Sequence, residues 1–277
     1  MENKLVYHYC SIETFLSIIQ NSVLRLTDIE KSNDYSERVY METLILKQFQ
    51  KKINNNPNGY LLDNFIVKYY QSLYTSSNLY ASCFSEDGDL LSQWRAYADN
   101  GTGVSIGFSK EYLEKTNNDE WGLKFKKINY NLIQHEEYAK KQVEIILTSL
   151  EDGKNFYAAM GDVFQNRIAE NSFMKNSAFA EEKEWRLSIA MSPEARITHE
   201  ATMQDFHLSP IKIYSKNNKL ITYFDLSFDK IKNLFIKKIV LGPNCKVEFL
   251  DIIHCLYVLG YDANNIAITK SDATYKM

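Results

Sequence analysis

Two glutamates and an arginine recur at every second position between residues 182 and 186. Because successive side chains of a strand point to opposite faces, Glu182, Glu184 and Arg186 can all lie on one side of a strand. Such a row can be a solvated edge or a cross-strand salt-bridge ladder. It can equally hold a carboxylate over a sugar, with the arginine orienting that carboxylate. The spacing therefore indicates either an ionic ladder or a carboxylate site.

Polar residues at two other places are also candidates for a site. His8 lies between two tyrosines on the alternating stretch 5–10, which predicts a strand, and a lone histidine on a strand is more often structural. Asn33, Asp34 and Glu37 crowd one turn, where helix capping explains them as well as ligand binding does. Neither group specifies a chemistry by itself.

The stretch 80–108 predicts a strand that ends at Ser85, a turn, a short helix and a second strand. Trp94 and Tyr97 fall on the same side of that helix. They suggest either a corner anchored by a core tryptophan or a polar elbow at the edge of a cleft. We expect Trp94 to be mostly buried, with Tyr97 nearer the opening.

Composition and length restrict the class of protein. The chain has 277 residues, 45% of them hydrophobic, and we predict a single α+β domain over residues 1–277. A net charge of −3 gives no global reason to bind nucleic acid or an anionic membrane, although a local basic patch stays open. No signal peptide or apolar run of membrane-spanning length is found, so we expect a cytoplasmic protein.

Familiar catalytic motifs are missing from the sequence. Its four cysteines form no C-x-x-C pair, and its five histidines lack metal-ligand spacing, so no metal site is predicted. No G-x-G-x-x-G, P-loop or G-x-S-x-G motif occurs. Classical dinucleotide-binding domains, P-loop NTPases and α/β-hydrolases are therefore disfavoured.

Hydrophobic periodicity predicts strands and helices along the whole chain. Strands are expected at 5–10, 23–26, 80–85, 104–108, 123–130, 184–190, 210–215, 219–226, 236–241 and 266–269. Helices are expected near 12–19, 39–49, 62–73, 90–97, 133–150, 154–172 and 246–259. The charged helices between about 133 and 175 indicate a helical insertion.

Four motifs taken together resemble one bacterial family. They are N-D-x-x-E at 33–37, C-F-S at 83–85, W-x-x-Y-x-x-x-x-x-G-V-x-I-x-F at 94–108 and E-x-E-W-R at 182–186. In their order and spacing, from about residue 5 to 272, the chain resembles the family called domain of unknown function 2971. Resemblance to that family assigns no activity.

The opening Y-H-Y-C-S, followed by an apolar helix and a short strand, is similar to the first motif of ADP-ribosyltransferases. Ser22 stands where that superfamily has a glycine. The resemblance implies a split, mostly antiparallel sheet with flanking helices that clasps NAD. It also implies a site made by His8, Ser85 and Glu184, which must then converge in one pocket.

The same resemblance implies a role for each candidate residue. Glu184 would stabilise an oxocarbenium-like ribose, helped by Arg186, while Glu182 would activate an acceptor. His8 would bind the adenosine-side ribose. Three aromatic side chains are candidates for stacking on the nicotinamide ring: Tyr9, Trp94 and Tyr97. Three polar residues would line the acceptor side: Asn33, Asp34 and Glu37.

Three functions remain open from the sequence. The first is an NAD-consuming transferase or glycohydrolase, expected to act as an intracellular toxin or antiphage defence effector. Its acceptor would be a protein or a nucleic acid, and its partner an antitoxin or another component of a defence system. The second is a metal-dependent nuclease that uses four acids: Asp34, Glu37, Glu182 and Glu184. The third is a non-catalytic sensor or partner-binding module that uses the same cleft for recognition.

Overall fold

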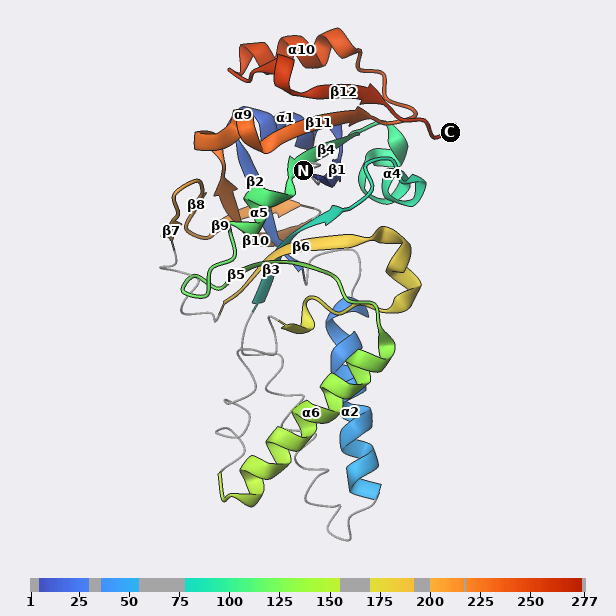
Figure 1. The fold of residues 1–277 in the computed structure, drawn as a ribbon, viewed down its shortest axis with the longest axis vertical. Coiled ribbons are helices and arrows are strands. Elements are labelled where there is room, and N and C mark those ends of the chain that lie inside the picture. The colour runs from blue at the N-terminus through green and yellow to red at the C-terminus, as the bar shows by residue number, and fades with distance from the viewer. Residues whose placement is uncertain are drawn as a thin grey trace.

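A single large sheet organises the protein. The computed structural model describes residues 5–29, 36–54, 78–154, 170–191, 200–216 and 218–275. Within these residues, twelve strands form one mixed, mostly antiparallel sheet, and helices flank it (Figure 1). Two long helices extend from the sheet as an arm (Figure 1). The predicted α+β class is confirmed.

The elements follow the predicted periodicity at most positions. The strands are β1 (Leu5–Cys10), β2 (Val23–Asp28), β3 (Asn78–Ser85), β4 (Val104–Ser109), β5 (Leu123–Lys127), β6 (Glu184–Met191), β7 (Ala201–Thr202), β8 (His207–Leu208), β9 (Lys212–Lys216), β10 (Lys219–Ser227), β11 (Ile236–Leu241) and β12 (Ala267–Lys270). The helices are α1 (Ile12–Asn21), α2 (Ser36–Asn54), α4 (Leu91–Tyr97), α5 (Lys110–Glu114), α6 (Leu132–Glu151), α9 (Lys232–Phe235) and α10 (Phe249–Val258). Short 3₁₀ helices are η2 (Asp99–Gly101), η3 (Ser177–Glu182), η4 (Asp229–Ile231) and η5 (Ala263–Asn265).

Local sequence explains where α1 begins and ends. The Ser11 side chain accepts a hydrogen bond from the Thr14 backbone N–H, which satisfies one of the free donors at the start of the helix. Ser22 ends α1 in the left-handed conformation, with its N–H on the Ile18 carbonyl. Phe15, Ile18 and Ile19 are the buried residues of this helix.

The edge of β3 is shared by two strands that separate from each other. β1 pairs with β3 at Tyr7 and Ser85, whereas β2 pairs with it further along, at Thr27 and Ala81. β6 occupies the other edge of β3 along its whole length. The sheet is therefore split between β1 and β2.

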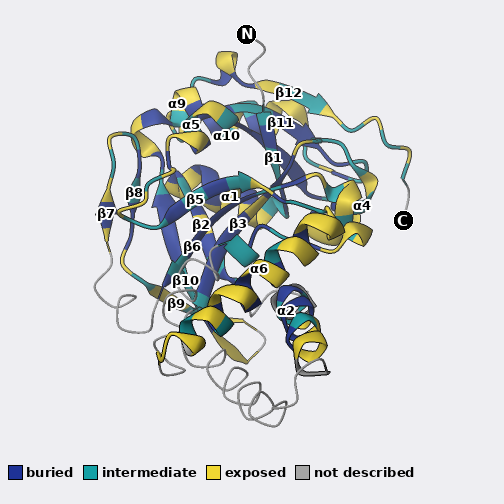
Figure 2. Ribbon diagram, turned by 60° about the horizontal axis from the view of Figure 1, so that its bottom comes forward, coloured by how far each residue is buried: buried dark blue, intermediate teal, exposed yellow. Residues whose placement is uncertain are grey.

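The main hydrophobic core lies on one face of this sheet. Even-numbered residues of β1 to β4 and odd-numbered residues of β5 and β6 contribute to it, among them Val6, Leu26, Phe84, Ile106 and Leu187. Figure 2 shows the buried strands at the centre and exposed positions on the outer helices. The other face carries polar side chains where β3 ends and β6 begins.

The arm has its own hydrophobic core, made by α2 and α6. Its buried residues are Met41, Leu44, Ile45, Leu46, Phe49, Ala139, Val143 and Ile146. Tyr40 and His135 are hydrogen-bonded between the two helices at 2.9 Å. The helix predicted at 133–150 is confirmed as α6. The predicted helix at 62–73 and most of the one at 154–172 lie outside the described residues.

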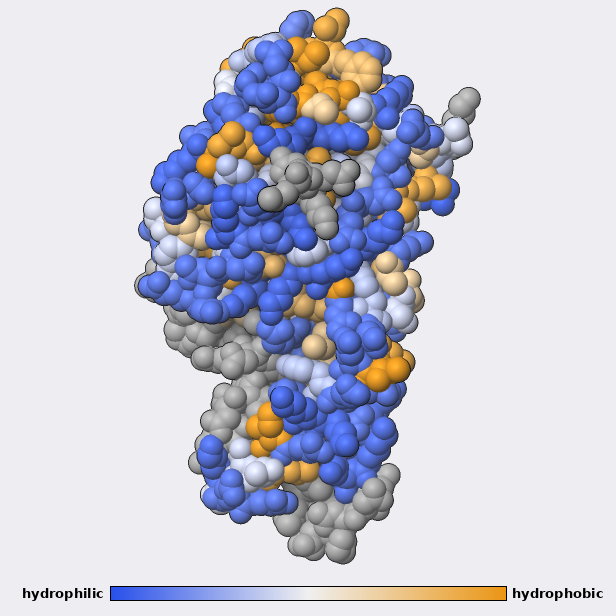
Figure 3. Space-filling view, in the orientation of Figure 1, coloured by the Kyte–Doolittle hydropathy of each residue, from blue (hydrophilic) through white to orange (hydrophobic). Residues whose placement is uncertain are grey.

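The surface is largely hydrophilic on the face drawn in Figure 3, with an apolar area over α10. Leu250, Tyr257 and Val258 are exposed on that helix. Among the described residues, none of the helices combines the length and apolar composition needed to cross a membrane.

Candidate functional site

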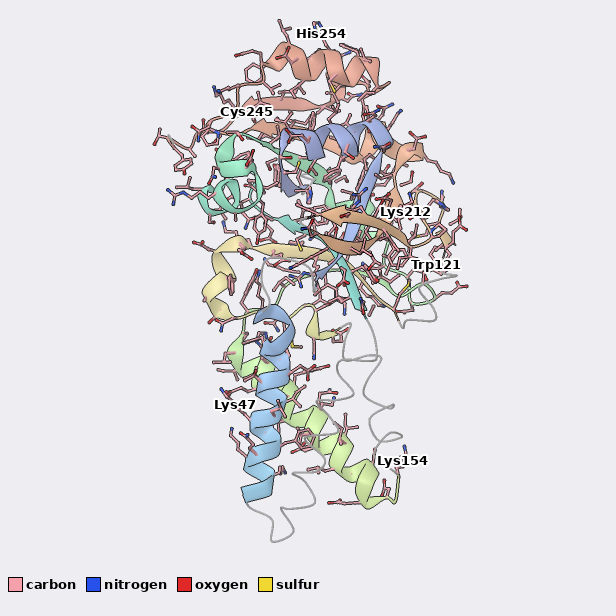
Figure 4. The ribbon with its side chains drawn as sticks, turned by 180° about the vertical axis from the view of Figure 1, so that it is seen from behind. Lys47, Trp121, Lys154, Lys212, Cys245 and His254 are labelled. Carbon is pink, nitrogen blue, oxygen red and sulfur yellow. The ribbon has the colours of Figure 1, made fainter. Side chains whose placement is uncertain are left out.

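The polar face of the sheet carries the residues of the C-F-S and E-x-E-W-R motifs. Ser85 pairs with Glu184, and Cys83 pairs with Arg186, so all four side chains start from one face of the sheet. The helix α4 and the segment around η3 lie on the same side of the molecule, next to the start of β6 (Figure 1, Figure 4). The candidate site is the region between them.

Two carboxylates and two cations form an ion cluster here, namely Lys175, Glu182, Glu184 and Arg186. Two N–H groups of Arg186 donate to Oε1 of Glu184, at 2.8 and 2.6 Å. The Lys175 ammonium joins the two glutamates, at 2.7 Å from Oε2 of Glu182 and 3.3 Å from Oε2 of Glu184. A third N–H of Arg186 donates to the Ser172 carbonyl at 2.9 Å. The cluster thus ties three chain segments together.

Electrostatics keep Glu184 ionised although it is only 5% exposed. Burial opposes the charged form, but the attraction of Arg186, followed by that of Lys175, outweighs it and lowers the pKa of this carboxyl. Tyr130 closes one side, where its hydroxyl accepts a hydrogen bond from the Glu184 backbone N–H. Burial, together with the charges of Glu184 and Glu182, raises the pKa of Tyr130 to about 12.

Tyr97 and Cys83 form the accessible part of this site. Tyr97 is 49% exposed, so it is more accessible than Trp94 as predicted, and Cys83 is exposed as well. Burial of the Tyr97 hydroxyl raises its pKa, and Glu182, Cys83 and Glu184 raise it further. The Cys83 thiol also helps to lower the pKa of Glu184 through a hydrogen bond. These two side chains therefore lie directly against the ion cluster.

The prediction that Glu182, Glu184 and Arg186 alternate along one strand is wrong for Glu182. That residue ends η3, Lys183 follows in the left-handed conformation, and β6 begins only at Glu184. The three side chains meet nevertheless, because Lys175 bridges the two glutamates. Lys175 was missed by the sequence analysis, since no spacing rule links a residue of an irregular segment to a strand nine positions later.

His8 does not join this site, which contradicts the expected convergence of His8, Ser85 and Glu184. Since Tyr7 pairs with Ser85, the next residue, His8, points to the opposite face of the sheet. There its ring lies 5.8 Å from the ring of the core residue Phe84. Its Nδ1 is 2.9 Å from the Cys83 carbonyl, on the edge of β3 where β1 and β2 separate. His8 thus has a structural role at the split.

We expect His8 to make the stability of the protein depend on pH. Burial lowers the pKa of His8. The neutral ring therefore contributes its full stability above the pKa of the unfolded chain, about 6.5. This contribution is lost as the pH falls from there through the lower pKa of the folded state. The free energy of unfolding, measured with urea, should therefore decrease more steeply between about pH 7 and 5 for wild type than for His8→Gln. The glutamine amide of that variant can still donate to the Cys83 carbonyl.

His135, whose pKa is also lowered by burial, is present in both proteins and cancels in this comparison. Equal pH slopes for wild type and His8→Gln would show that His8 does not cause the dependence.

Three other residues that were predicted to bind the cofactor are buried and hydrogen-bonded within the protein. Trp94 is fully buried, as expected for a core anchor, and donates to Asp89 at 2.6 Å, so it cannot stack on a ligand. Tyr9 is 5% exposed, and its hydroxyl donates to the Asp87 carbonyl and accepts from the Leu90 N–H, each at 2.8 Å. Ser85 is 2% exposed and donates to the Glu182 carbonyl at 2.7 Å.

The predicted acceptor-side residues are not placed by the structure. Asn33 and Asp34 lie outside the described residues, and so does the side chain of Glu37, although its backbone belongs to α2. Across the described part of the chain, no group of three or more histidine, cysteine or acidic side chains could hold a metal ion. The Lys175 ammonium lies between the carboxylates of Glu182 and Glu184.

The fold and the site thus define an α+β protein with a buried ion cluster beside an exposed tyrosine and thiol. Residues 93–187 match the model of a family described as "Protein of unknown function (DUF2971)", which confirms that resemblance over about a third of the chain. The match contains most of α4, including Tyr97, and the whole ion cluster. Neither the curated proteins nor the solved structures contain a significant match.

Proposed function

We propose that the chain is a recognition module that binds a nucleotide, with NAD as the first ligand to test, at the opening beside Tyr97 and Cys83. One observation carries this proposal: the charged groups expected to act in catalysis are engaged with each other. Arg186 holds one oxygen of Glu184, and Lys175 holds the other and also Glu182. The cluster therefore gives the site shape and charge, while the accessible groups contact the ligand.

The accessible groups suit a planar ligand. The half-exposed ring of Tyr97 offers a face on which a base or a nicotinamide can stack. Its hydroxyl, raised in pKa by burial and by the nearby carboxylates, stays protonated and can donate a hydrogen bond. Lys183, whose side chain is 51% exposed and pairs with Asp87 at 3.5 Å, adds a cation that a phosphate could contact.

Ligand protection of Cys83 tests this proposal. In a Cys255→Ser background Cys83 should be the reactive thiol, because Cys10 and Cys245 are buried. Saturating NAD or another nucleotide should slow alkylation of Cys83. Tyr97→Ala should raise the Kd roughly 5-fold, the equivalent of about 1 kcal/mol of lost stacking, whereas Tyr97→Phe should keep most of the affinity. A nucleotide panel without any protection would refute the proposal.

An NAD-consuming transferase or glycohydrolase is the second candidate, and two observations favour it. Glu184 is ionised, as stabilisation of a ribosyl cation requires. The sheet is split between β1 and β2, and a split sheet is one feature that the resemblance of the opening motif implies. Against it, His8 is on the opposite face, and Tyr9 and Trp94 are buried. Free nicotinamide that appears with wild type but not with Glu184→Gln would favour this candidate over the recognition module.

A metal-dependent nuclease has less support than these two candidates. Of its four predicted acids, the side chains of Asp34 and Glu37 lie outside the described residues, and the other two share the Lys175 ammonium. Nothing in the described structure supports the expected role as a toxin or defence effector over other roles.

A further inference from the structure

A second polar surface is formed by three neighbouring strands, β2, β10 and β9. Tyr223 at its centre pairs with Thr27 on one side and with Lys212 on the other. The same register places six side chains on this face, here called the ribbon surface: Arg25, Lys212, Tyr214, Lys216, Lys219 and Tyr223. Figure 4 shows β9 and β10 with Lys212 labelled beside them.

Planar groups are stacked at the centre of the ribbon surface. The Arg25 guanidinium lies 3.8 Å from the centroid of the Tyr223 ring and 5.4 Å from that of Tyr214. The two tyrosine rings are 5.4 Å apart in an edge-to-face arrangement. Asp225 anchors this group, since it pairs with Arg25 at 3.2 Å and with Lys212 at 3.1 Å. The Arg25 guanidinium and the Tyr214 ring are thus held in place before a ligand stacks on them.

The ribbon surface is positively charged within an acidic protein. It carries four cations and the single carboxylate of Asp225, against a net charge of −3 for the chain. The Arg25 and Lys212 side chains are 40% and 47% exposed, and Lys216 and Lys219 are exposed too. Lys216 and Lys219 face each other directly across the strands. Like charges in that position destabilise a sheet, and a polyanion would relieve the repulsion.

We propose that the ribbon surface binds single-stranded nucleic acid. Its lysines would contact the phosphates, while bases would stack on Tyr214 and on the guanidinium plane of Arg25. An anionic membrane fits less well, because the exposed apolar residues Ile213 and Leu220 belong to the other face of the strands. This inference goes beyond the proposed nucleotide recognition and uses none of its residues.

Fluorescence anisotropy of labelled single strands of DNA and RNA, about 15 nucleotides long, tests the proposal. The charge variant is Lys216→Glu with Lys219→Glu. Its matched control is Lys140→Glu with Lys141→Glu, which makes the same charge change at exposed positions of α6. Arg25→Lys keeps the charge but removes the stacking plane, and Tyr214→Leu removes the ring. Far-UV circular dichroism and thermal unfolding identify any variant that fails to fold.

Wild type is expected to bind both strands with an affinity that falls steeply as salt rises from about 50 to 200 mM. The variant Lys216→Glu with Lys219→Glu loses two phosphate contacts, so its slope of log K against log salt should be shallower by about 1.4. Its affinity should fall at least about 10-fold, while the affinity of the α6 control should change little. Tyr214→Leu and Arg25→Lys should each weaken binding, the former by about 10-fold.

Several results would overturn the proposal. These are no binding at about 50 mM salt, equal losses in the two charge variants, or folded stacking variants with unchanged affinity. Tighter binding to duplex DNA, or binding only to phosphatidylserine vesicles, would also overturn it by identifying a different partner.

Discussion

Arg186→Met is expected to lower the free energy of unfolding by about 3 to 5 kcal/mol, the usual cost of removing one partner from a buried ion pair. The side chains of Arg186 and Glu184 are only 4% and 6% exposed. Without the guanidinium, Lys175 is the cation that stays beside the Glu184 carboxylate, and the hydrogen bond from Arg186 to the Ser172 carbonyl is lost. Urea denaturation at pH 7 measures the loss.

A double variant separates the charge effect from lost packing. In Glu184→Gln with Arg186→Met no unpaired carboxylate remains, so most of the lost stability should return. Glu184→Gln alone should also destabilise, because Arg186 is then left with a weaker acceptor. A double variant as unstable as Arg186→Met would show that packing, rather than an uncompensated charge, is responsible.

The pH dependence gives an independent check on the Arg186→Met result. In wild type the lowered pKa of Glu184 contributes stability above the unfolded value of about 4.3, and this is lost as the pH falls through the folded-state value. In Arg186→Met the same carboxyl is buried with less compensation, so protonation relieves it. The difference in stability between the two proteins should therefore shrink towards acidic pH. A constant difference would contradict the electrostatic explanation.

Trp94→Ala is the other substitution with a large expected effect, about 3 to 5 kcal/mol of lost stability. Trp94 is fully buried, lies edge-to-face with Tyr9 at 4.7 Å, and donates from Nε1 to Asp89. Alanine would leave a cavity between α4 and β1 and would remove one of the hydrogen bonds that Asp89 accepts. Thermal unfolding together with urea denaturation measures the effect.

Two variants serve as controls for Trp94→Ala. Trp94→Phe keeps a ring but removes the N–H donor, so its loss should be smaller than that of alanine. Tyr97→Ala on the same helix should cost far less stability, because that ring is half exposed. If Trp94→Ala melted like wild type but lost ligand binding, Trp94 would be a stacking platform on the surface and not a core anchor.

Sequence by itself determined most of the strands and helices that the structure describes. Alternation identified β1, β3, β4, β6 and β11, because a side-chain period of two is a local property of an extended backbone. The expectation that Trp94 is buried and Tyr97 more accessible is also confirmed. The motif pattern also indicated the family resemblance that the match over residues 93–187 confirms.

Only the tertiary structure decided which polar residues meet. The face on which His8 lies depends on the register of β1 against β3, and a shift of one residue would have reversed it. The ion cluster depends on Lys175, which an irregular segment brings back to the start of β6. The ribbon surface likewise needs Arg25 and Tyr223, about 200 residues apart in sequence, on neighbouring strands. Such contacts follow from strand pairing across long chain separations, which no local periodicity encodes.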